Sequence, residues 1–150
     1  MNRLLDWPAG ARELVDSLEV ARLATVEADG QPHVVPICFV VVEDSLYSVI
    51  DAKPKRRPLA LKRLQNIAAN PRATVVADRY DADWTRLAWA MLSGRANVVD
   101  DDPEYAEAIA RLTAKYAQYR ATCFARGTHP LLRLRIDNVC FWSYLTRAAG

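Results

Sequence analysis

Apolar and polar positions change their periodicity several times along the chain, and each change predicts an element. Residues 7–20 place apolar side chains on one face at helical spacing, which predicts a short first helix. Two apolar runs then flank Asp29-Gly30, a strong hairpin signal. A second turn at residues 43–45 leads to a third strand, from Leu46 to Ile50. This part of the chain is therefore expected to form a three-strand meander.

The rest of the chain alternates between helical and strand periodicity. Apolar residues recur at helical spacing after Pro58, and Asn70-Pro71 ends that run. The later elements are expected to be a strand over 72–80, a strand over 83–100 that bends at Gly94, a helix over 101–116 with Asp102 as its N-cap, and a strand over 131–145.

Short turns between successive strands predict antiparallel pairing, because parallel strands need long crossover connections. The chain has no repeats and no low-complexity linker. We therefore predict a mainly β single domain over residues 1–150, in which a small antiparallel barrel is decorated by helices.

Composition narrows the class of protein. The 150 residues are 51% apolar with a net charge of +2, an ordinary balance for one globular domain and not the overall basic excess of a nucleic-acid binder. No apolar run approaches the ~20 residues of a membrane span. The charged N-terminal residues do not resemble a signal peptide. Three widely spaced cysteines in apolar surroundings are interpreted as buried thiols, and we expect a cytoplasmic protein.

No side-chain catalyst is recognisable in the sequence. There is no Gly-rich phosphate loop, no H-E-x-x-H and no nucleophile elbow. The run Asp100 to Asp102 precedes Pro103-Glu104 and fits helix capping better than a metal site. If the protein is an enzyme, a bound cofactor is expected to supply the chemistry.

The stretch "DAKPKRRPLALKRLQN", residues 51–66, holds six of the chain's twenty basic residues. A solvated loop and a nucleic-acid patch are both possible interpretations, although no aromatic residue is interleaved to stack bases. Its first four cations follow a predicted strand and precede a predicted helix. Cations at a helix N-terminus are locally unfavourable unless an anion neutralises them, so this placement favours a phosphate site.

Four other residues stay open to two interpretations each. Trp84 and Trp89 differ by an odd number and would face opposite sides of a regular strand, so at least one is expected in the core or at a dimer interface. His33 fits a surface or structural position in a strand. Thr25 interrupts an apolar strand, and its hydroxyl could face solvent or hydrogen-bond a ring.

The segment "ARLATVEADGQPHVVPICFVVVEDSLYSVIDAKPKR" resembles the opening of the pyridoxamine-phosphate-oxidase-like split β-barrel family, and "NPRATVVADRYDADWTRLAWAMLSGRA" continues the likeness. With "DWTRL", the chain resembles an actinobacterial subgroup of reductases that depend on the deazaflavin coenzyme F420. The C-terminal "FWSYLTRAAG" lacks the R-L-x-P-type segment with which true pyridoxamine phosphate oxidases grip substrate, and this argues against pyridoxal phosphate synthesis.

The resemblance implies an FMN-binding split barrel that forms a homodimer with cofactor sites at the interface. It implies an oxidoreductase that uses F420 for hydride transfer to a small unsaturated organic acceptor. An FMN-dependent oxidoreductase of the same fold is the alternative, and a non-enzymatic protein that binds flavin, deazaflavin or haem is a second. The six cations of residues 51–66 favour F420, because its tail carries more negative charge than FMN.

The resemblance also implies a set of site residues. Thr25 and the strand from His33 through Val35 to Pro36 would border the ring, with Ser48, Ile50 and Asp51 beside the cofactor at the end of the third strand. Lys53, Lys55 and Arg56 would hold the phosphate, Lys62 and Arg63 would meet the tail carboxylates, and Trp89 would lie on the partner-side strand.

Overall fold

One antiparallel sheet dominates the computed structural model, which describes residues 5–51 and 61–149, with side chains up to residue 146. Its spatial order is β2-β1-β5-β6-β7-β4-β3. The strands are β1 (Ala21–Val26), β2 (Pro32–Ile37), β3 (Val40–Val42), β4 (Ser45–Val49), β5 (Arg72–Arg79), β6 (Ala88–Val98) and β7 (Leu131–Ser143). Each neighbouring pair is antiparallel, which confirms the predicted fold class.

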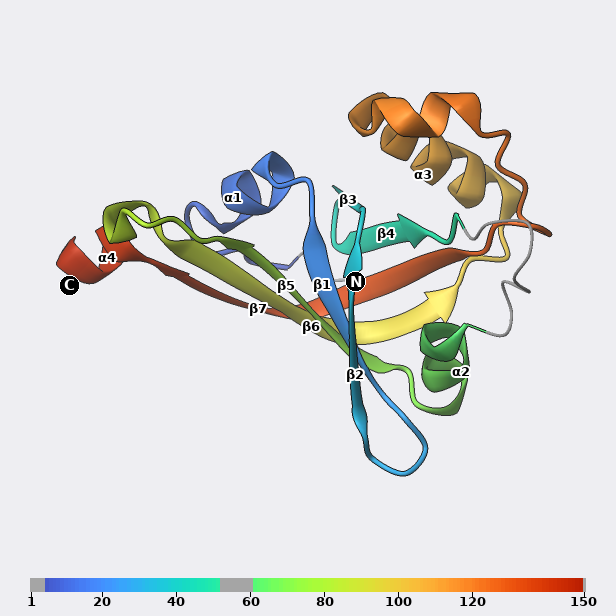
Figure 1. Cartoon of the computed structure of the whole chain (residues 1–150), viewed down its shortest axis with the longest axis horizontal. Helices are drawn as coiled ribbons and strands as arrows, with labels where there is room; N and C mark the ends of the chain where they lie inside the picture. Colours follow the sequence, from blue (N-terminus) through green and yellow to red (C-terminus); the bar gives the residue numbers. More distant parts are fainter. Residues whose placement is uncertain (1–4, 52–60, 150) are drawn as a thin grey trace.

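Four α-helices and two 3-10 turns accompany the sheet within the described ranges. They are α1 (Ala11–Ser17), α2 (Lys62–Ala69), η2 (Trp84–Arg86), α3 (Asp102–Lys115), η3 (Ala117–Ala121) and α4 (Tyr144–Ala149). α3 lies over β3 and β4, whereas α1 and α2 pack on other parts of the sheet (Figure 1). The paired strands β5, β6 and β7 extend away from the half-barrel as an arm that ends in η2 and α4 (Figure 1). None of the described helices is long and apolar enough to cross a bilayer.

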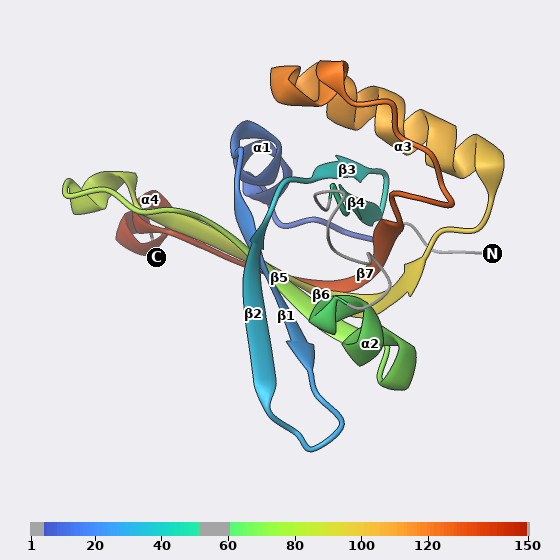
Figure 2. The ribbon, with the colours of Figure 1, turned by 45° about the vertical axis from the view of Figure 1, so that its right-hand side comes forward.

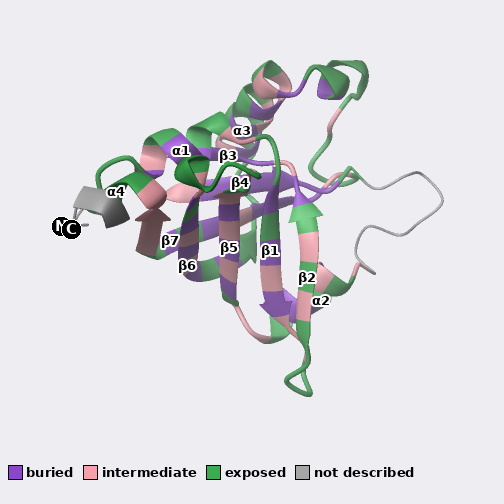
Figure 3. Ribbon diagram, turned by 60° about the vertical axis from the view of Figure 1, so that its left-hand side comes forward, coloured by how far each residue is buried: buried purple, intermediate pink, exposed green. Residues whose placement is uncertain are grey.

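Successive side chains of a strand point to opposite faces of the sheet, and apolar side chains form a core on each face. Leu23, Val75 and Leu92 are fully buried on the inner face, where α1 and α2 cover them. The resulting bands of buried and exposed residues run along β1 and β5 (Figure 3). On the other face, Tyr105 and Leu112 of α3 form a smaller cluster with residues of β3 and β4. Burial of both clusters fixes the register, because a one-residue slip would turn every core side chain to the opposite face.

A β-bulge lies where β6 passes β7 at Gly94, the position at which the sequence predicted a bend. Ser93 pairs with Asn138 and Gly94 pairs with Ile136, so Asp137 is an extra residue in β7. A Cβ on Gly94 would lie 1.8 Å from the carbonyl oxygen of Arg135. Only glycine allows this close approach of the two backbones.

Several predicted boundaries and placements were wrong. The second apolar run divides into β2 and β3 around Cys38 and Phe39. Asp101, not Asp102, caps α3, since its carboxylate accepts the N–H of Glu104 at 2.8 Å. The strand expected over 83–100 begins only at Ala88, and that expected over 131–145 ends at Ser143 where α4 begins.

Trp84 and the three cysteines also differ from prediction. η2 carries Trp84, so the strand-parity argument does not apply to it. Trp84 is 63% and Trp89 38% exposed, and neither is in the core. Cys123 is exposed and Cys38 and Cys140 are half-buried, so the interpretation as buried thiols was wrong.

Candidate cofactor site

A pocket of about 260 Å³ opens where the chain leaves β4. Its lining residues come from or adjoin β1, β2, β4, α2 and η3, and in the view of Figure 2 α2 lies below β4. Segments that are distant in sequence therefore meet here. The lining residues are Val20, Pro36, Ile37, Cys38, Ser48, Val49, Asp51, Arg63 and Tyr119.

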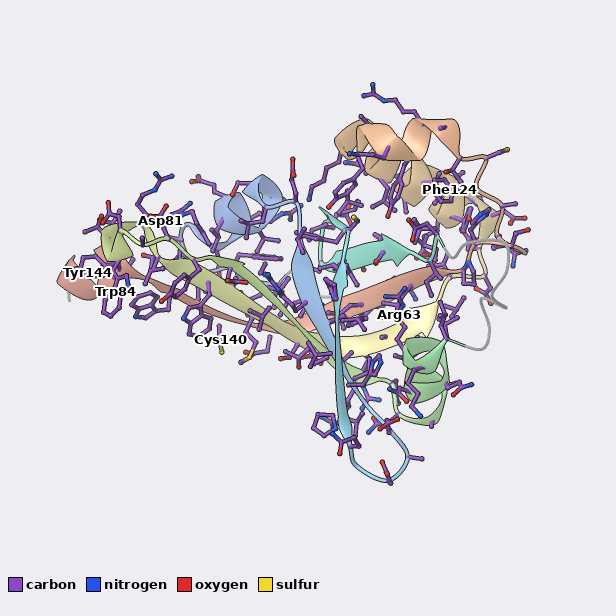
Figure 4. The ribbon with its side chains drawn as sticks, viewed as in Figure 1. Arg63, Asp81, Trp84, Phe124, Cys140 and Tyr144 are labelled. Atoms are coloured by element: carbon purple, nitrogen blue, oxygen red, sulfur yellow. The ribbon has the colours of Figure 1, made fainter. Side chains whose placement is uncertain are left out.

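Local structure explains how α2 presents Arg63 to the pocket. The helix is fixed to β1 by a buried hydrogen bond in which the Asn66 amide donates to the Thr25 hydroxyl at 3.0 Å. Leu64 and Ile67 bury the apolar face of the helix. Lys62, the preceding residue, instead forms an ion pair with Glu27. Arg63 extends from α2 toward the strands (Figure 4) and is available to a ligand in the pocket.

Burial shifts the pKa values of two side chains in the pocket, Arg63 and Tyr119. Burial lowers the pKa of the Arg63 guanidinium, and the neighbouring Asp51 carboxylate and Tyr119 oppose that shift. Arginine nonetheless stays protonated in proteins. Burial is the largest cause that raises the pKa of Tyr119, and the hydrogen bond with Cys38 is the second. The site therefore offers one guanidinium cation, a neutral phenol and a carboxylate beside the apolar wall of Pro36 and Val49.

Four of the residues predicted for the cofactor site come together in this pocket: Pro36, Ser48, Asp51 and Arg63. Lys53, Lys55 and Arg56 lie outside the described residues, in the segment that begins directly after Asp51. The pocket therefore adjoins the start of the basic segment.

The other predicted residues are elsewhere in the described chain. Thr25 is 1% exposed, so its hydroxyl faces the interior and not solvent. His33 pairs in register with Thr25, and its Nδ1 is buried without a hydrogen-bond partner among the described residues. Ile50 is buried in the larger core cluster, and Val35 is half-buried against that cluster. Trp89 lies on the exposed face of β6, outside this pocket.

Two polar residues of the pocket were missed by the sequence analysis. Cys38 stands at the break between β2 and β3, which the continuous apolar run concealed. Tyr119 belongs to η3, a short turn after α3 that has no periodic signal. An aromatic residue just after a predicted helix was the only available indication.

The family described as "Pyridoxamine 5'-phosphate oxidase" matches residues 8–143 of this chain. A search of curated proteins finds no match. Among solved structures, a FAD-binding protein from Mesorhizobium loti is 22% identical with a TM-score of 0.68, covering 93% of this chain and 95% of that one. HutZ, the haem storage protein from Vibrio cholerae, is 17% identical with a TM-score of 0.70, covering 88% and 90%.

A conserved hypothetical protein from Mycobacterium tuberculosis is 15% identical with a TM-score of 0.75, covering 99% of this chain and 91% of that one. At these identities the similarity establishes the split-barrel fold.

Proposed function

The chain belongs to the pyridoxamine 5'-phosphate oxidase family, and from this premise we propose that it is an F420-dependent oxidoreductase that transfers hydride to a small unsaturated organic acceptor. One observation carries the proposal. The pocket joins Arg63, Asp51 and Ser48 to an apolar wall directly where the basic segment begins. A cofactor with a flat ring and an anionic tail needs this combination of surfaces.

The number of cations supports the deazaflavin over FMN, the alternative on the same fold. Both cofactors carry a ribityl phosphate, and F420 adds a tail with several carboxylates. Lys53, Lys55 and Arg56 would hold the phosphate, and Arg63, which lines the pocket, would meet a tail carboxylate. A charge-assisted contact contributes roughly 1.5–3 kcal/mol when well formed. Three such contacts total roughly 4.5–9 kcal/mol, so micromolar binding, which needs about 8 kcal/mol after association costs, would also require burial of the ring on the apolar wall.

The chain's own residues would bind and orient, and the bound deazaflavin would supply the hydride. Pro36 and Val49 offer an apolar surface that excludes water from the ring. The Tyr119 phenol, whose pKa is raised by burial, would donate a hydrogen bond to the cofactor but is a weak proton source at neutral pH. Asp51 can accept from a ring N–H and limits the net positive charge around Arg63.

We also propose that the active form is a homodimer in which the partner completes each site. The one-chain pocket, about 260 Å³, is slightly smaller than the ~300–1,000 Å³ of typical ligand sites. Trp89 is exposed in the isolated chain and would lie on the partner-side strand. A second chain would therefore enlarge the site and cover this tryptophan.

The same pocket allows a haem-binding alternative, because a Cys38 thiol could ligate iron. The raised pKa of Tyr119 disfavours a tyrosinate ligand. Absorbance of the purified protein separates the possibilities. Tight yellow flavin absorbance supports FMN and a Soret band supports haem, whereas a colourless preparation supports a weakly held deazaflavin.

The decisive experiment is a binding titration of F420 against FMN. We expect F420 to bind more tightly. The variant pair Lys55→Ala and Arg56→Ala should weaken F420 binding about 100-fold, and Arg63→Gln about tenfold. Arg111→Gln is the matched control, since this exposed residue of α3 pairs with Glu107 away from the pocket. Unchanged affinity in Lys55→Ala and Arg56→Ala would refute the phosphate assignment, and preference for FMN would replace the proposal with its alternative.

A further inference from the structure

Five arginines of the described strands lie on the face of the sheet opposite the inner core, and the described residues pair only two of them with a carboxylate. Arg22 of β1 forms an ion pair with Asp78 of β5 at 2.7 Å. Arg133 of β7 donates to both carboxylate oxygens of Glu104 in α3, at 2.7 and 3.1 Å. The remaining three are Arg72, Arg95 and Arg135.

These three arginines form a row across three adjacent strands. Arg72 of β5 is directly opposite Arg95 of β6, which is directly opposite Arg135 of β7. All three are exposed, and none forms an ion pair with any residue of the described chain. We call them the arginine row.

Such a row is unfavourable on its own. Like charges directly opposite each other in antiparallel strands destabilise a sheet. The two ion pairs on the same face show that carboxylates are placed beside arginines elsewhere. Strands lie about 4.8 Å apart, so the row spans about 10 Å. That span suits an anion with two or more charged groups better than a single small ion.

A pocket of about 430 Å³ lies beside the row. Arg72 and Arg95 line it together with the hydroxyls of Thr74 and Ser93, which are 3.3 Å apart. Asp137, the extra residue of the β7 bulge, also lines the pocket and offsets part of the charge. Guanidinium groups can bind phosphate or carboxylate oxygens bidentately, and hydroxyls can donate to a further oxygen.

We propose that the arginine row, with Thr74 and Ser93, is a binding site for an oligoanion, a diphosphate or polycarboxylate whose charged groups span neighbouring strands. This site shares no lining residue with the candidate cofactor pocket. It does not depend on which cofactor that pocket holds.

Titration calorimetry of the whole chain with pyrophosphate and with citrate tests the site. The measurements use the Lys55→Gln/Arg56→Gln background, so that the basic segment does not bind the probe. We expect binding in this background and a loss of about tenfold or more on adding Arg95→Gln. Adding Arg111→Gln removes the same charge from α3 and should leave the affinity unchanged. Tighter binding of pyrophosphate would indicate a phosphate ligand, and tighter binding of citrate would indicate a carboxylate ligand.

Thermal unfolding at low salt without anion provides a second readout. Arg95→Gln should raise the melting temperature because it relieves the repulsion in the row, whereas Arg111→Gln should not. Equal affinity in Arg95→Gln and the background, or no binding of either probe, overturns the proposal. So does a change in sedimentation with Arg95→Gln in the absence of probe binding, since the row would then meet acidic groups of a second chain.

Discussion

Thr25 and Asn66 show how a single buried contact can hold a functional element. Both are almost fully buried, and the amide of Asn66 donates to the Thr25 hydroxyl at 3.0 Å. The pair joins β1 to α2, the helix that carries Arg63. A polar residue within an apolar strand marked Thr25 as notable. The sequence could not reveal its partner, which is 41 positions away.

Breaking this contact should loosen α2. Thr25→Val leaves a buried Asn66 donor without its acceptor, and we expect a loss of about 1–3 kcal/mol in the free energy of unfolding. Asn66→Ala should cost a similar amount, and the double variant should cost less than the sum of the two. Urea denaturation of all four proteins gives the coupling energy. A coupling near zero would show that the two residues act independently.

Tyr116 predicts a loss of stability at alkaline pH. Its hydroxyl accepts the N–H of Phe39 and donates to the Glu19 carbonyl, and burial raises its pKa to about 12. A raised folded-state pKa favours the neutral phenol. Its stabilisation is therefore complete below the unfolded value near 10 and declines as pH rises toward about 12, by up to ~1.4 kcal/mol per pH unit.

The check is the free energy of unfolding in urea from about pH 9 to about pH 11.5. Tyr116→Phe should be less stable at neutral pH and should make the alkaline decline shallower. Tyr80→Phe is the control, because Tyr80 is 75% exposed. An equally steep decline in Tyr116→Phe would remove this tyrosine as a cause. Tyr105, whose pKa burial also raises to about 12, contributes to the decline that remains.

At the scale of elements, the sequence predicted correctly those helices and turns whose conformation depends on neighbouring residues. The Asp29-Gly30 hairpin, the long third helix and the alternation of β5 were all confirmed, because turn chemistry and periodicity are encoded in adjacent residues. The prediction failed where apolar periodicity does not decide the conformation. The strand expected from residue 83 was one such case, since Asp83 caps a 3-10 turn by accepting the N–H of Thr85 two residues later. Short turns such as η3 have no period to detect.

Gly94 gives an element-scale prediction. Gly94→Ala would force Cβ to within 1.8 Å of the Arg135 carbonyl oxygen, so β6 and β7 would have to separate at the bulge. We expect a loss of several kcal/mol or failure to fold. Gly127→Ala is the matched control, because nothing lies within 4 Å of its added Cβ, and its effect should stay within about 0.5 kcal/mol. Thermal unfolding and soluble yield measure both variants, and equal stability would refute the bulge constraint.

At the scale of the whole molecule, the single chain leaves a large aromatic side chain exposed on a projecting part of the sheet. The arm of β5, β6 and β7 projects from the half-barrel (Figure 1) and carries Trp89, which is 38% exposed. Trp142 is its direct neighbour on β7 and is half-buried. Large exposed apolar patches commonly mark interaction surfaces. The sequence suggested a dimer through resemblance alone, because no single-chain pattern encodes which surface meets a second copy.

The proposed homodimer predicts that Trp89→Glu gives a monomer. A carboxylate placed among apolar groups at the interface would have to be desolvated without a partner, and this opposes association. Sedimentation velocity should show the shift, and F420 affinity should fall with it because each site would lose its second wall. Ala110→Glu adds the same charge on the exposed side of α3 and should leave the dimer intact. If Trp89→Glu sediments as the unchanged chain does, this part of the arm does not form the interface.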